Sequence, residues 1–139
     1  MMTTAPFRAD LADGPSGARA FWIRAEDGLR LRIAHYPGPE LSSGTVLLFP
    51  GRTEYVEKYG HVARDFADRG FHTLTIDWRG QGLADRMTGD PRTGHVDQFM
   101  DYQMDVSAMW AAAYDLGLPE PFYLEGHSMG GCIGLRALY

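Results

Sequence analysis

One stretch of the chain reads Pro121-Phe122-Tyr123-Leu124-Glu125-Gly126-His127-Ser128-Met129-Gly130-Gly131. Its first half is a short apolar run that predicts a buried strand, and its second half is a glycine-rich turn followed by a helical pattern. Gly126, Ser128 and Gly130 form a Gly-x-Ser-x-Gly sequence within the turn. That sequence is common by itself and becomes informative when a strand precedes it and a helix follows it. The stretch therefore predicts a sharp strand-to-helix turn that presents the Ser128 hydroxyl.

Steric arguments explain the two glycines of this turn. A turn this tight leaves no room for Cβ atoms beside the serine, so Gly126 and Gly130 are needed at their positions. The turn would lie at the carboxyl edge of the sheet, where open α/β sheets bind their ligands. There the N–H of Met129 would face a reacting carbonyl, with the helix dipole behind it. We therefore predict Ser128 as a nucleophile and the Met129 amide as an oxyanion donor.

The rest of the chain alternates between strand and helix patterns. A β-hairpin is predicted around Asp27-Gly28, with Arg30 and Arg32 on its solvated face. The expected strands are 21–24, 29–33, 45–49, 71–77 and 121–125, and the expected helices are 54–69, 96–117 and the segment after Ser128. A hairpin followed by β-α-β-α-β-α predicts an α/β fold, with a parallel sheet and right-handed crossover helices.

Two regions are expected along the chain. Residues 1–19 contain the breaker cluster Asp13-Gly14-Pro15-Ser16-Gly17 and show no hydrophobic periodicity, so they are expected to form a flexible leader. Residues 20–139 are expected to form one incomplete α/β domain that ends inside the helix after Ser128.

Composition excludes several classes of protein. A chain of 139 residues with 45% hydrophobic and 22% charged residues is typical of one globular domain. No apolar run is long enough to span a membrane, and no secretory signal is visible, so a cytoplasmic location is expected. The net charge of −5 argues against nucleic acid as a partner. Cys132 is the single cysteine and is expected to be a small buried residue.

Two other glycine-rich motifs are excluded by single positions. A phosphate-binding loop requires Lys where Cys132 follows Gly131. A dinucleotide-binding loop requires Gly where Ser128 stands, and it belongs at the first strand–helix turn of the sheet rather than the third.

Three segments together carry a resemblance to a known family. They are Gly126-His127-Ser128-Met129-Gly130-Gly131, Asp77-Trp78-Arg79-Gly80-Gln81-Gly82-Leu83-Ala84 and Phe49-Pro50-Gly51-Arg52. Over residues 20–139 the chain resembles the N-terminal half of an α/β-hydrolase of the lysophospholipase and monoacylglycerol-lipase-like (serine aminopeptidase-like) branch. The resemblance implies the N-terminal part of an α/β-hydrolase sheet, small acyl esters as substrates, and neither cofactor nor metal. It also implies that the Arg52 N–H is a second oxyanion donor beside Met129.

The chain departs from the family pattern in places. Pro50 stands where the family usually has His, and Ala84 where it usually has Ser. In the family, the triad runs in the order Ser, then Asp or Glu, then His. Residues 129–139, which follow Ser128, contain no Asp, Glu or His. Two functions are therefore expected: a serine ester hydrolase that acts through an acyl-enzyme on Ser128, or a truncated, non-catalytic fragment that is inert or depends on a partner chain.

Upstream groups are weighed as substitutes for the missing triad members. His95 lies in the long loop near the catalytic edge and is the best candidate for a substitute base, whereas His127 is expected to point away from Ser128. Asp77 is expected to hold the Arg79 loop by hydrogen bonds. The strand 122–125 is expected to have an open edge, through which the chain could associate with another copy.

Overall fold

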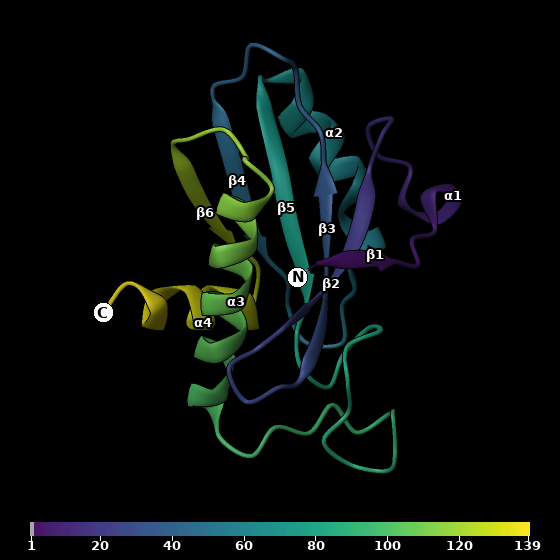
Figure 1. Ribbon diagram of the computed structural model, residues 1–139, viewed down its shortest axis with the longest axis vertical. Helices are drawn as coiled ribbons and strands as arrows, with labels where there is room; N and C mark the ends of the chain where they lie inside the picture. Colours follow the sequence, from purple (N-terminus) through teal and green to yellow (C-terminus); the bar gives the residue numbers. More distant parts are fainter. Residues whose placement is uncertain (1) are drawn as a thin grey trace.

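A mixed six-stranded sheet forms the centre of the protein in its computed structural model, which describes residues 2–139 (Figure 1). The strands are β1 Thr3–Ala5, β2 Arg19–Arg24, β3 Arg30–Tyr36, β4 Gly44–Phe49, β5 Phe71–Asp77 and β6 Phe122–Gly126. The α-helices are α1 Ala9–Ala12, α2 Gly60–Asp68, α3 Tyr102–Asp115 and α4 Met129–Ala137, with short 3₁₀ helices η1 Val56–Tyr59 and η2 Phe99–Asp101. The strand order across the sheet is β1-β2-β3-β5-β4-β6.

Pairing within the sheet confirms the predicted α/β class. β2 and β3 form the expected antiparallel hairpin, and Gly28 in its turn has a φ of 84° that favours glycine. β4 pairs in parallel with β5 on one side and with β6 on the other, so that Leu47 lies opposite both Leu74 and Leu124.

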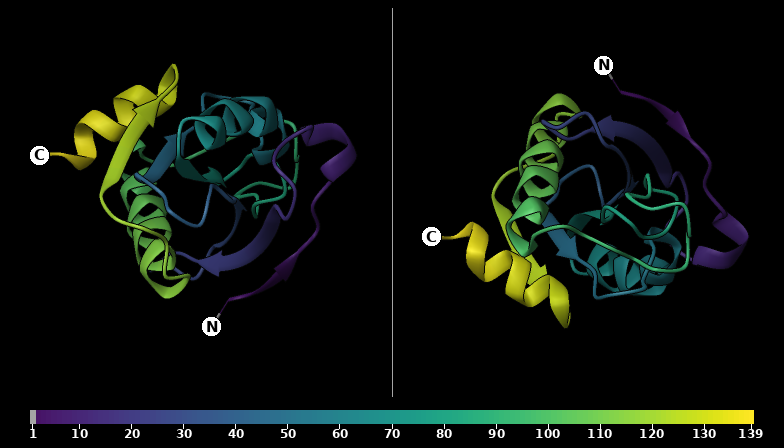
Figure 2. Two further views of the ribbon diagram at one scale, coloured as in Figure 1. Left: turned by 90° about the horizontal axis from the view of Figure 1, so that it is seen from above. Right: turned by 90° about the horizontal axis from the view of Figure 1, so that it is seen from below.

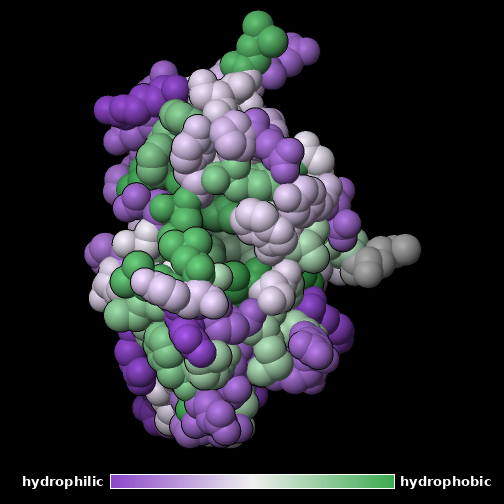
Figure 3. Space-filling model, turned by 90° about the vertical axis from the view of Figure 1, so that its left-hand side faces the viewer, coloured by the Kyte–Doolittle hydropathy of each residue, from purple (hydrophilic) through white to green (hydrophobic). Residues whose placement is uncertain are grey.

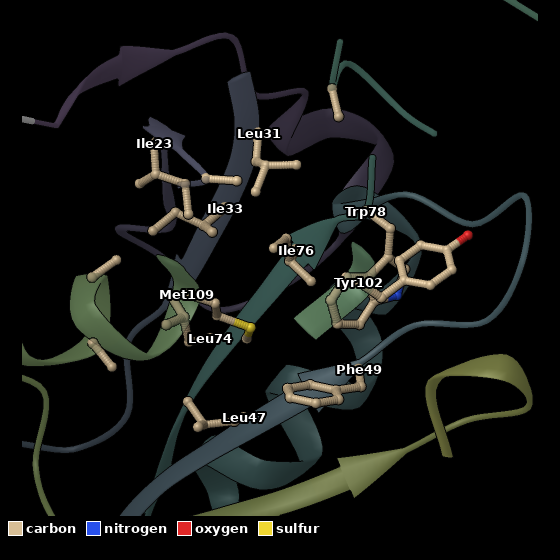
Figure 4. Close-up of a cluster of buried hydrophobic side chains, with 14 of the residues drawn as sticks. Ile23, Leu31, Ile33, Leu47, Phe49, Leu74, Ile76, Trp78, Tyr102 and Met109 are labelled. Atoms are coloured by element: carbon tan, nitrogen blue, oxygen red, sulfur yellow. The ribbon is translucent and has the colours of Figure 1, made fainter. Parts of the chain in front are cut away.

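Helices cover both faces of the sheet, with α3 and α4 on one face and α1 and α2 on the other (Figures 1 and 2). The larger core lies under α3 and α4, where Phe49, Trp78, Tyr102 and Met109 meet the apolar side chains of the strands (Figure 4). The smaller core, on the other face, joins α1, η1 and α2 to the sheet through small residues and Tyr36. Because β3 contributes to both cores, its side chains are covered on both faces.

Two expectations for the hairpin and the helices differ from the structure. Arg32, expected on a solvated face, is 2% exposed because η1 and the N-terminal segment cover that face of β3. The helix expected over 54–69 becomes α-helical only at Gly60, after the 3₁₀ turn η1. At the start of that turn, the Val56 N–H donates to Asp77 Oδ1 at 2.9 Å, so a side chain of β5 satisfies the first amide.

The N-terminal segment also differs from the expected flexible leader. Within the described residues 2–19, β1 pairs antiparallel with β2, and α1 packs against η1. The Arg64 guanidinium donates to Asp13 at 2.6 Å, which joins this segment to α2. Elements of three and four residues are too short to produce a periodic pattern, so the sequence showed only the turn signals between them.

The side of the molecule at β6 and α4 is the least covered. Tyr123 and Leu124 of β6 are 48% and 40% exposed, and Leu135 of α4 is 63% exposed. A space-filling view of this side shows hydrophobic residues gathered around a hollow (Figure 3). Leu47, Trp110, Leu124 and Leu138 are among the residues that line it. No helix formed by residues 2–139 is long and apolar enough to cross a membrane.

Candidate active site

The sheet topology opens a crevice at the carboxyl end of β4. The chain passes from β4 through α2 to β5 on one side, and later reaches β6 on the other side. The helices that follow β4 and β6 cover opposite faces of the sheet, so the loops after these two neighbouring strands diverge (Figure 2). Open α/β sheets bind ligands at such a switch point. The loop 50–55 and the turn 126–128 both lie there.

Ser128 occupies the turn between β6 and α4, as the sequence predicts. Its backbone has a φ of 54° and a ψ of −122°, a conformation that a residue with a side chain rarely adopts, and its side chain is exposed. Crowding explains the flanking glycines. A Cβ atom on Gly126 would lie 2.7 Å from the Cα of Gly131, and one on Gly130 would collide with the carbonyl oxygen of Phe49. The turn thus packs directly against the end of β4.

The Pro50-Gly51-Arg52 segment is oriented by donors from the loop after β5. Trp78 Nε1 donates to the Pro50 carbonyl at 2.9 Å, and Gln81 Nε2 donates to the Gly51 carbonyl at 3.1 Å. In a trans peptide the N–H points opposite to the C=O. The bond from Gln81 to the Gly51 carbonyl therefore turns the Arg52 N–H to the other side of the segment.

Two backbone amides beside Ser128 are without acceptors. Within residues 2–139, neither the Arg52 N–H nor the Met129 N–H donates a hydrogen bond. The two segments also approach closely, because a Cβ atom placed on Gly51 would lie 3.2 Å from the Cβ of Ser128. The site therefore contains an exposed hydroxyl and two unpaired N–H groups on adjacent segments.

A buried carboxylate, that of Glu54, lies behind the Gly51 amide. Its Oε1 accepts hydrogen bonds from the Gly51 N–H and, at 2.8 Å, from the Tyr59 hydroxyl, and it lies 3.0 Å from His127 Nδ1. Its Oε2 pairs with the ammonium group of Lys58. Burial alone would raise the pKa of Glu54, but the bonds from Lys58, His127 and Tyr59 outweigh it and hold the pKa at about 2.

A second buried carboxylate, that of Asp77, joins three elements. It accepts hydrogen bonds from the Val56 N–H, from the Leu83 N–H at 2.8 Å and from Arg32 Nε at 2.8 Å. Arg32 in turn donates two hydrogen bonds of 2.8 Å to Glu57. Asp77 therefore holds the loop after β5, as expected, through the Leu83 N–H.

The Arg79 side chain itself is held by different residues. Its guanidinium is fully buried and pairs with Asp105 of α3 at 2.8 Å and with Asp27 of the hairpin turn at 2.9 Å. Burial explains why Arg79 needs both carboxylates, because an unpaired buried guanidinium would be strongly unfavourable. Through Arg79, the loop that carries Trp78 and Gln81 is joined both to α3 and to the turn of the β2–β3 hairpin.

The histidines lie apart from the Ser128 hydroxyl. In the described part of the chain no side chain forms a hydrogen bond with that hydroxyl. His95, the least implausible of the histidines as a substitute base, is hydrogen-bonded to Asp97 at 2.8 Å. His127 is 60% exposed and contacts Glu54. Cys132, expected to be buried, is exposed on α4.

The sequence did not single out Glu54, Gln81 or three of the acidic partners of the buried arginines, which are Asp27, Glu57 and Asp105. Glu54 lies in the same loop as Gly51, three positions further along the chain, so the sequence alone could have indicated a contact between them. The partners of Arg32 and Arg79 lie 25 or more residues away along the chain, and nothing local marks them. Among residues 2–139, no group of three or more His, Cys, Asp or Glu is placed to hold a metal ion.

The strand order and the positive-φ serine between β6 and α4 are those of an α/β-hydrolase. Solved structures agree. An α/β hydrolase from Novosphingobium aromaticivorans superposes with a TM-score of 0.65 and 29% identity, covering 88% of this chain and 40% of that one. A carboxyl esterase from Bacillus coagulans has a TM-score of 0.71 at 20% identity, over 86% of this chain and 39% of that one, and supports the fold alone.

The chain belongs to the serine aminopeptidase S33 family, which it matches over residues 41–139. It is 43% identical to lysophospholipase L2 of Escherichia coli over 105 residues, which cover 76% of this chain and 29% of that protein. It is 31% identical to phospholipase YtpA of Bacillus subtilis over 94 residues, 66% of this chain and 32% of that protein. The chain therefore spans about a third of the length of these curated relatives.

Proposed function

We propose that this chain carries the nucleophile and the oxyanion hole of a serine hydrolase that cleaves carboxylic esters. Ser128 is the nucleophile, the Arg52 and Met129 N–H groups are the oxyanion donors, and Gly126 and Gly130 allow the turn. The observation that carries the proposal is the strained backbone of Ser128 at the carboxyl end of β6, with two unpaired amides beside it. Strain of this kind is concentrated at functional sites.

The proposed reaction is acyl transfer in two steps. The Ser128 Oγ attacks the ester carbonyl while its proton passes to a base, and the negative charge on the former carbonyl oxygen is stabilised by the two N–H groups. The tetrahedral intermediate then expels the alcohol, which takes up the proton, and leaves an acyl-enzyme that water hydrolyses. Residues 129–139 contain no Asp, Glu or His to act as the base or its partner. The proposal therefore places those two groups outside residues 129–139.

Lysophospholipid-like acyl esters are the proposed substrates. The support is the 43% identity to lysophospholipase L2 and the 31% identity to phospholipase YtpA. An esterase from Exiguobacterium antarcticum is also among the structures that share the fold. The rival function is a non-catalytic fragment that is inert or needs a partner chain.

Active-site labelling of the purified chain tests the nucleophile without requiring turnover. At high reagent concentration and long incubation, a fluorophosphonate should add slowly but only once, at Ser128, and the adduct should be absent from the Ser128→Ala variant when both are examined by intact mass and peptide mapping. Equal labelling of the two proteins, or none of the wild type, would contradict the proposal and favour the inert fragment.

Turnover of a short p-nitrophenyl ester separates the two functions further. The isolated chain should hydrolyse the ester slowly, because loss of a triad member costs about 10⁴-fold in rate or more. A fast rate that disappears in Ser128→Ala would mean that the chain completes its own site, and a His95→Gln variant would then show whether His95 supplies the base.

A further inference from the structure

One oxygen atom collects donors from three separate parts of the site. Glu54 Oε1 is contacted by the Gly51 N–H of the loop after β4, by the Tyr59 hydroxyl of η1 at 2.8 Å, and by His127 Nδ1 of the turn before Ser128 at 3.0 Å. The residue is 5% exposed, so water competes little for these bonds. The loop with the Arg52 amide and the turn with Ser128 are thus joined through a single carboxylate.

Chemistry assigns the direction of each of these bonds. An ionised carboxylate can only accept hydrogen bonds. The pKa of Glu54, held at about 2, keeps it ionised at neutral pH. His127 must therefore carry a hydrogen on Nδ1 and donate it to Glu54. The Tyr59 hydroxyl, which donates to Glu54, lies 3.2 Å from the same Nδ1.

The position of Gly51 makes this contact relevant to catalysis. A Cβ atom on Gly51 would collide with Glu54 Oε1 and would also lie 3.2 Å from the Ser128 Cβ. Gly51 is therefore enclosed between the carboxylate and the nucleophile. The next residue along the chain is Arg52, whose N–H is the proposed oxyanion donor. A displacement of Gly51 would move that N–H relative to Ser128.

We propose that Glu54 is a positioning residue, which holds the Gly51–Arg52 segment at its distance from Ser128 by binding the Gly51 N–H and His127 with one oxygen. The inference rests on the proposed function in that the Arg52 amide is taken as an oxyanion donor. The role needs the negative charge as well as the shape, because a carboxylate accepts stronger hydrogen bonds from these three donors than a neutral group would. Lys58, half exposed, partly neutralises the charge from the outer side.

The test compares Glu54 variants with a matched control in the same chain. Glu57 is also 5% exposed and carries a buried carboxylate on η1, but it binds Arg32 and the Arg8 N–H rather than the loop or the turn. Glu54→Gln, Glu54→Ala and Glu57→Gln are made. For each folded variant, NMR measures the hydrogen exchange of the Gly51 amide and the ¹⁵N shifts of the His127 ring.

The expected outcome is specific to Glu54. Exchange of the Gly51 amide should accelerate about tenfold or more in Glu54→Ala, and less in Glu54→Gln, whose amide oxygen still accepts a hydrogen bond. The Nδ1–H form of His127 should be lost in Glu54→Ala and largely kept in Glu54→Gln, whose amide oxygen can still accept from Nδ1. Glu57→Gln should change neither signal, even though it lowers the stability of the chain. If the Glu54 variants do not fold, His127→Ala, at an exposed position, should still accelerate exchange at Gly51.

Two results would overturn the inference: unchanged Gly51 exchange in the Glu54 variants, or equal acceleration in Glu57→Gln. Fluorophosphonate labelling adds a functional measurement. Its rate should fall up to about 10²-fold in Glu54→Ala, the cost of misplacing a catalytic group by about 1 Å, and it should be partly restored in Glu54→Gln. If wild-type Ser128 does not react at all, the proposed function fails, while the NMR comparison still decides the role of Glu54.

Discussion

β4 and β6 are neighbouring parallel strands that lead into the two halves of the candidate site, yet their surroundings differ. Every residue of β4 is buried, with β5 and β6 on its two edges and helices on both faces. β6 has one neighbour, and four of its five residues are exposed. The loop with Arg52 thus follows a strand that is covered on both faces and both edges. Ser128 follows a strand that pairs along one edge only.

The difference shows where the position of Ser128 is determined. Since β6 is open to solvent, the turn depends on its contacts with the end of β4. The His127 N–H donates to the Phe49 carbonyl at 3.0 Å, and Gly130 lies against the same carbonyl. The position of β4 therefore determines the positions of both the Arg52 loop and the Ser128 turn. The predictions below test this dependence.

Gly130→Ala should have the largest effect. Its new Cβ atom would collide with the Phe49 carbonyl oxygen and lie 2.6 Å from that of Pro50, and neither backbone atom can move without displacing β4. We expect a loss of more than about 3 kcal/mol in the free energy of unfolding, measured by denaturant titration.

The control for this prediction is the adjacent glycine. A Cβ atom on Gly131 would lie 3.7 Å from the Gly126 carbonyl oxygen, an ordinary contact. Gly131→Ala should be neutral or stabilising by up to about 1 kcal/mol, because alanine has the higher helix propensity and its Cβ atom has room here. Equal destabilisation by both variants would show that the turn does not rest on β4 as described.

Leu47→Ala and Leu124→Ala compare the two strands directly, because these residues lie opposite each other in the sheet. Leu47 is 2% exposed and Leu124 is 40% exposed. The first substitution should cost about 2–5 kcal/mol and the second less than about 1 kcal/mol in unfolding free energy. Similar costs would mean that β6 is covered in solution.

The stability of the protein should depend on pH through a histidine pair on β3 and β5, two strands with neighbours on both edges. His35 of β3 and His72 of β5 lie with Nε2 and Nδ1 3.0 Å apart. Burial, with smaller contributions from His72 and Arg19, lowers the pKa of His35 to about 4 from its usual 6.5. Folding therefore favours the neutral ring. The stability is fully present above pH 6.5 and is lost as the pH falls from there toward about 4.

Denaturant titrations at pH 7 and pH 4.5 measure this effect. The unfolding free energy should fall by about 1–3 kcal/mol, and less so in His35→Gln, which cannot titrate. An equal fall in the variant would assign the pH dependence to other groups.

Ser128→Gly should have the smallest effect, and in the opposite direction. Glycine adopts a φ of 54° and a ψ of −122° at lower cost than serine, so the substitution should raise the unfolding free energy by about 1 kcal/mol relative to Ser128→Ala. Thermal unfolding of the two variants measures the difference. If Ser128→Gly is the less stable, the turn is not strained.

Much of the fold could be predicted because its signals are local. A continuous apolar run predicted β4 to within one residue, the segment 71–77 was predicted as the second buried strand and is β5, and Asp27-Gly28 predicted the hairpin. The parallel order followed from the alternation of strands and helices. The starts of α2 and α3 were less predictable, since 3₁₀ turns precede both and satisfy their first amides by tertiary contacts or tight turns.

The candidate site was predictable only in part. The residues at the turn, from Gly126 to Gly130, are adjacent in the sequence, so their pattern was visible. The burial of Arg32 was not, because it depends on Asp77 and Glu57, and on the N-terminal segment, which has no periodicity. Charged residues carry no local signal of burial, since their partners are brought in by the fold.

The contacts that orient the site have a consequence for how the protein folds. Trp78 and Pro50 are 28 residues apart, Arg32 and Asp77 45, and His127 and Glu54 73. Closing such long loops costs chain entropy, which these bonds offset only when β4, β5 and β6 already lie side by side. No short segment can therefore acquire the site geometry in advance. We therefore expect the site geometry to form together with the sheet rather than before it.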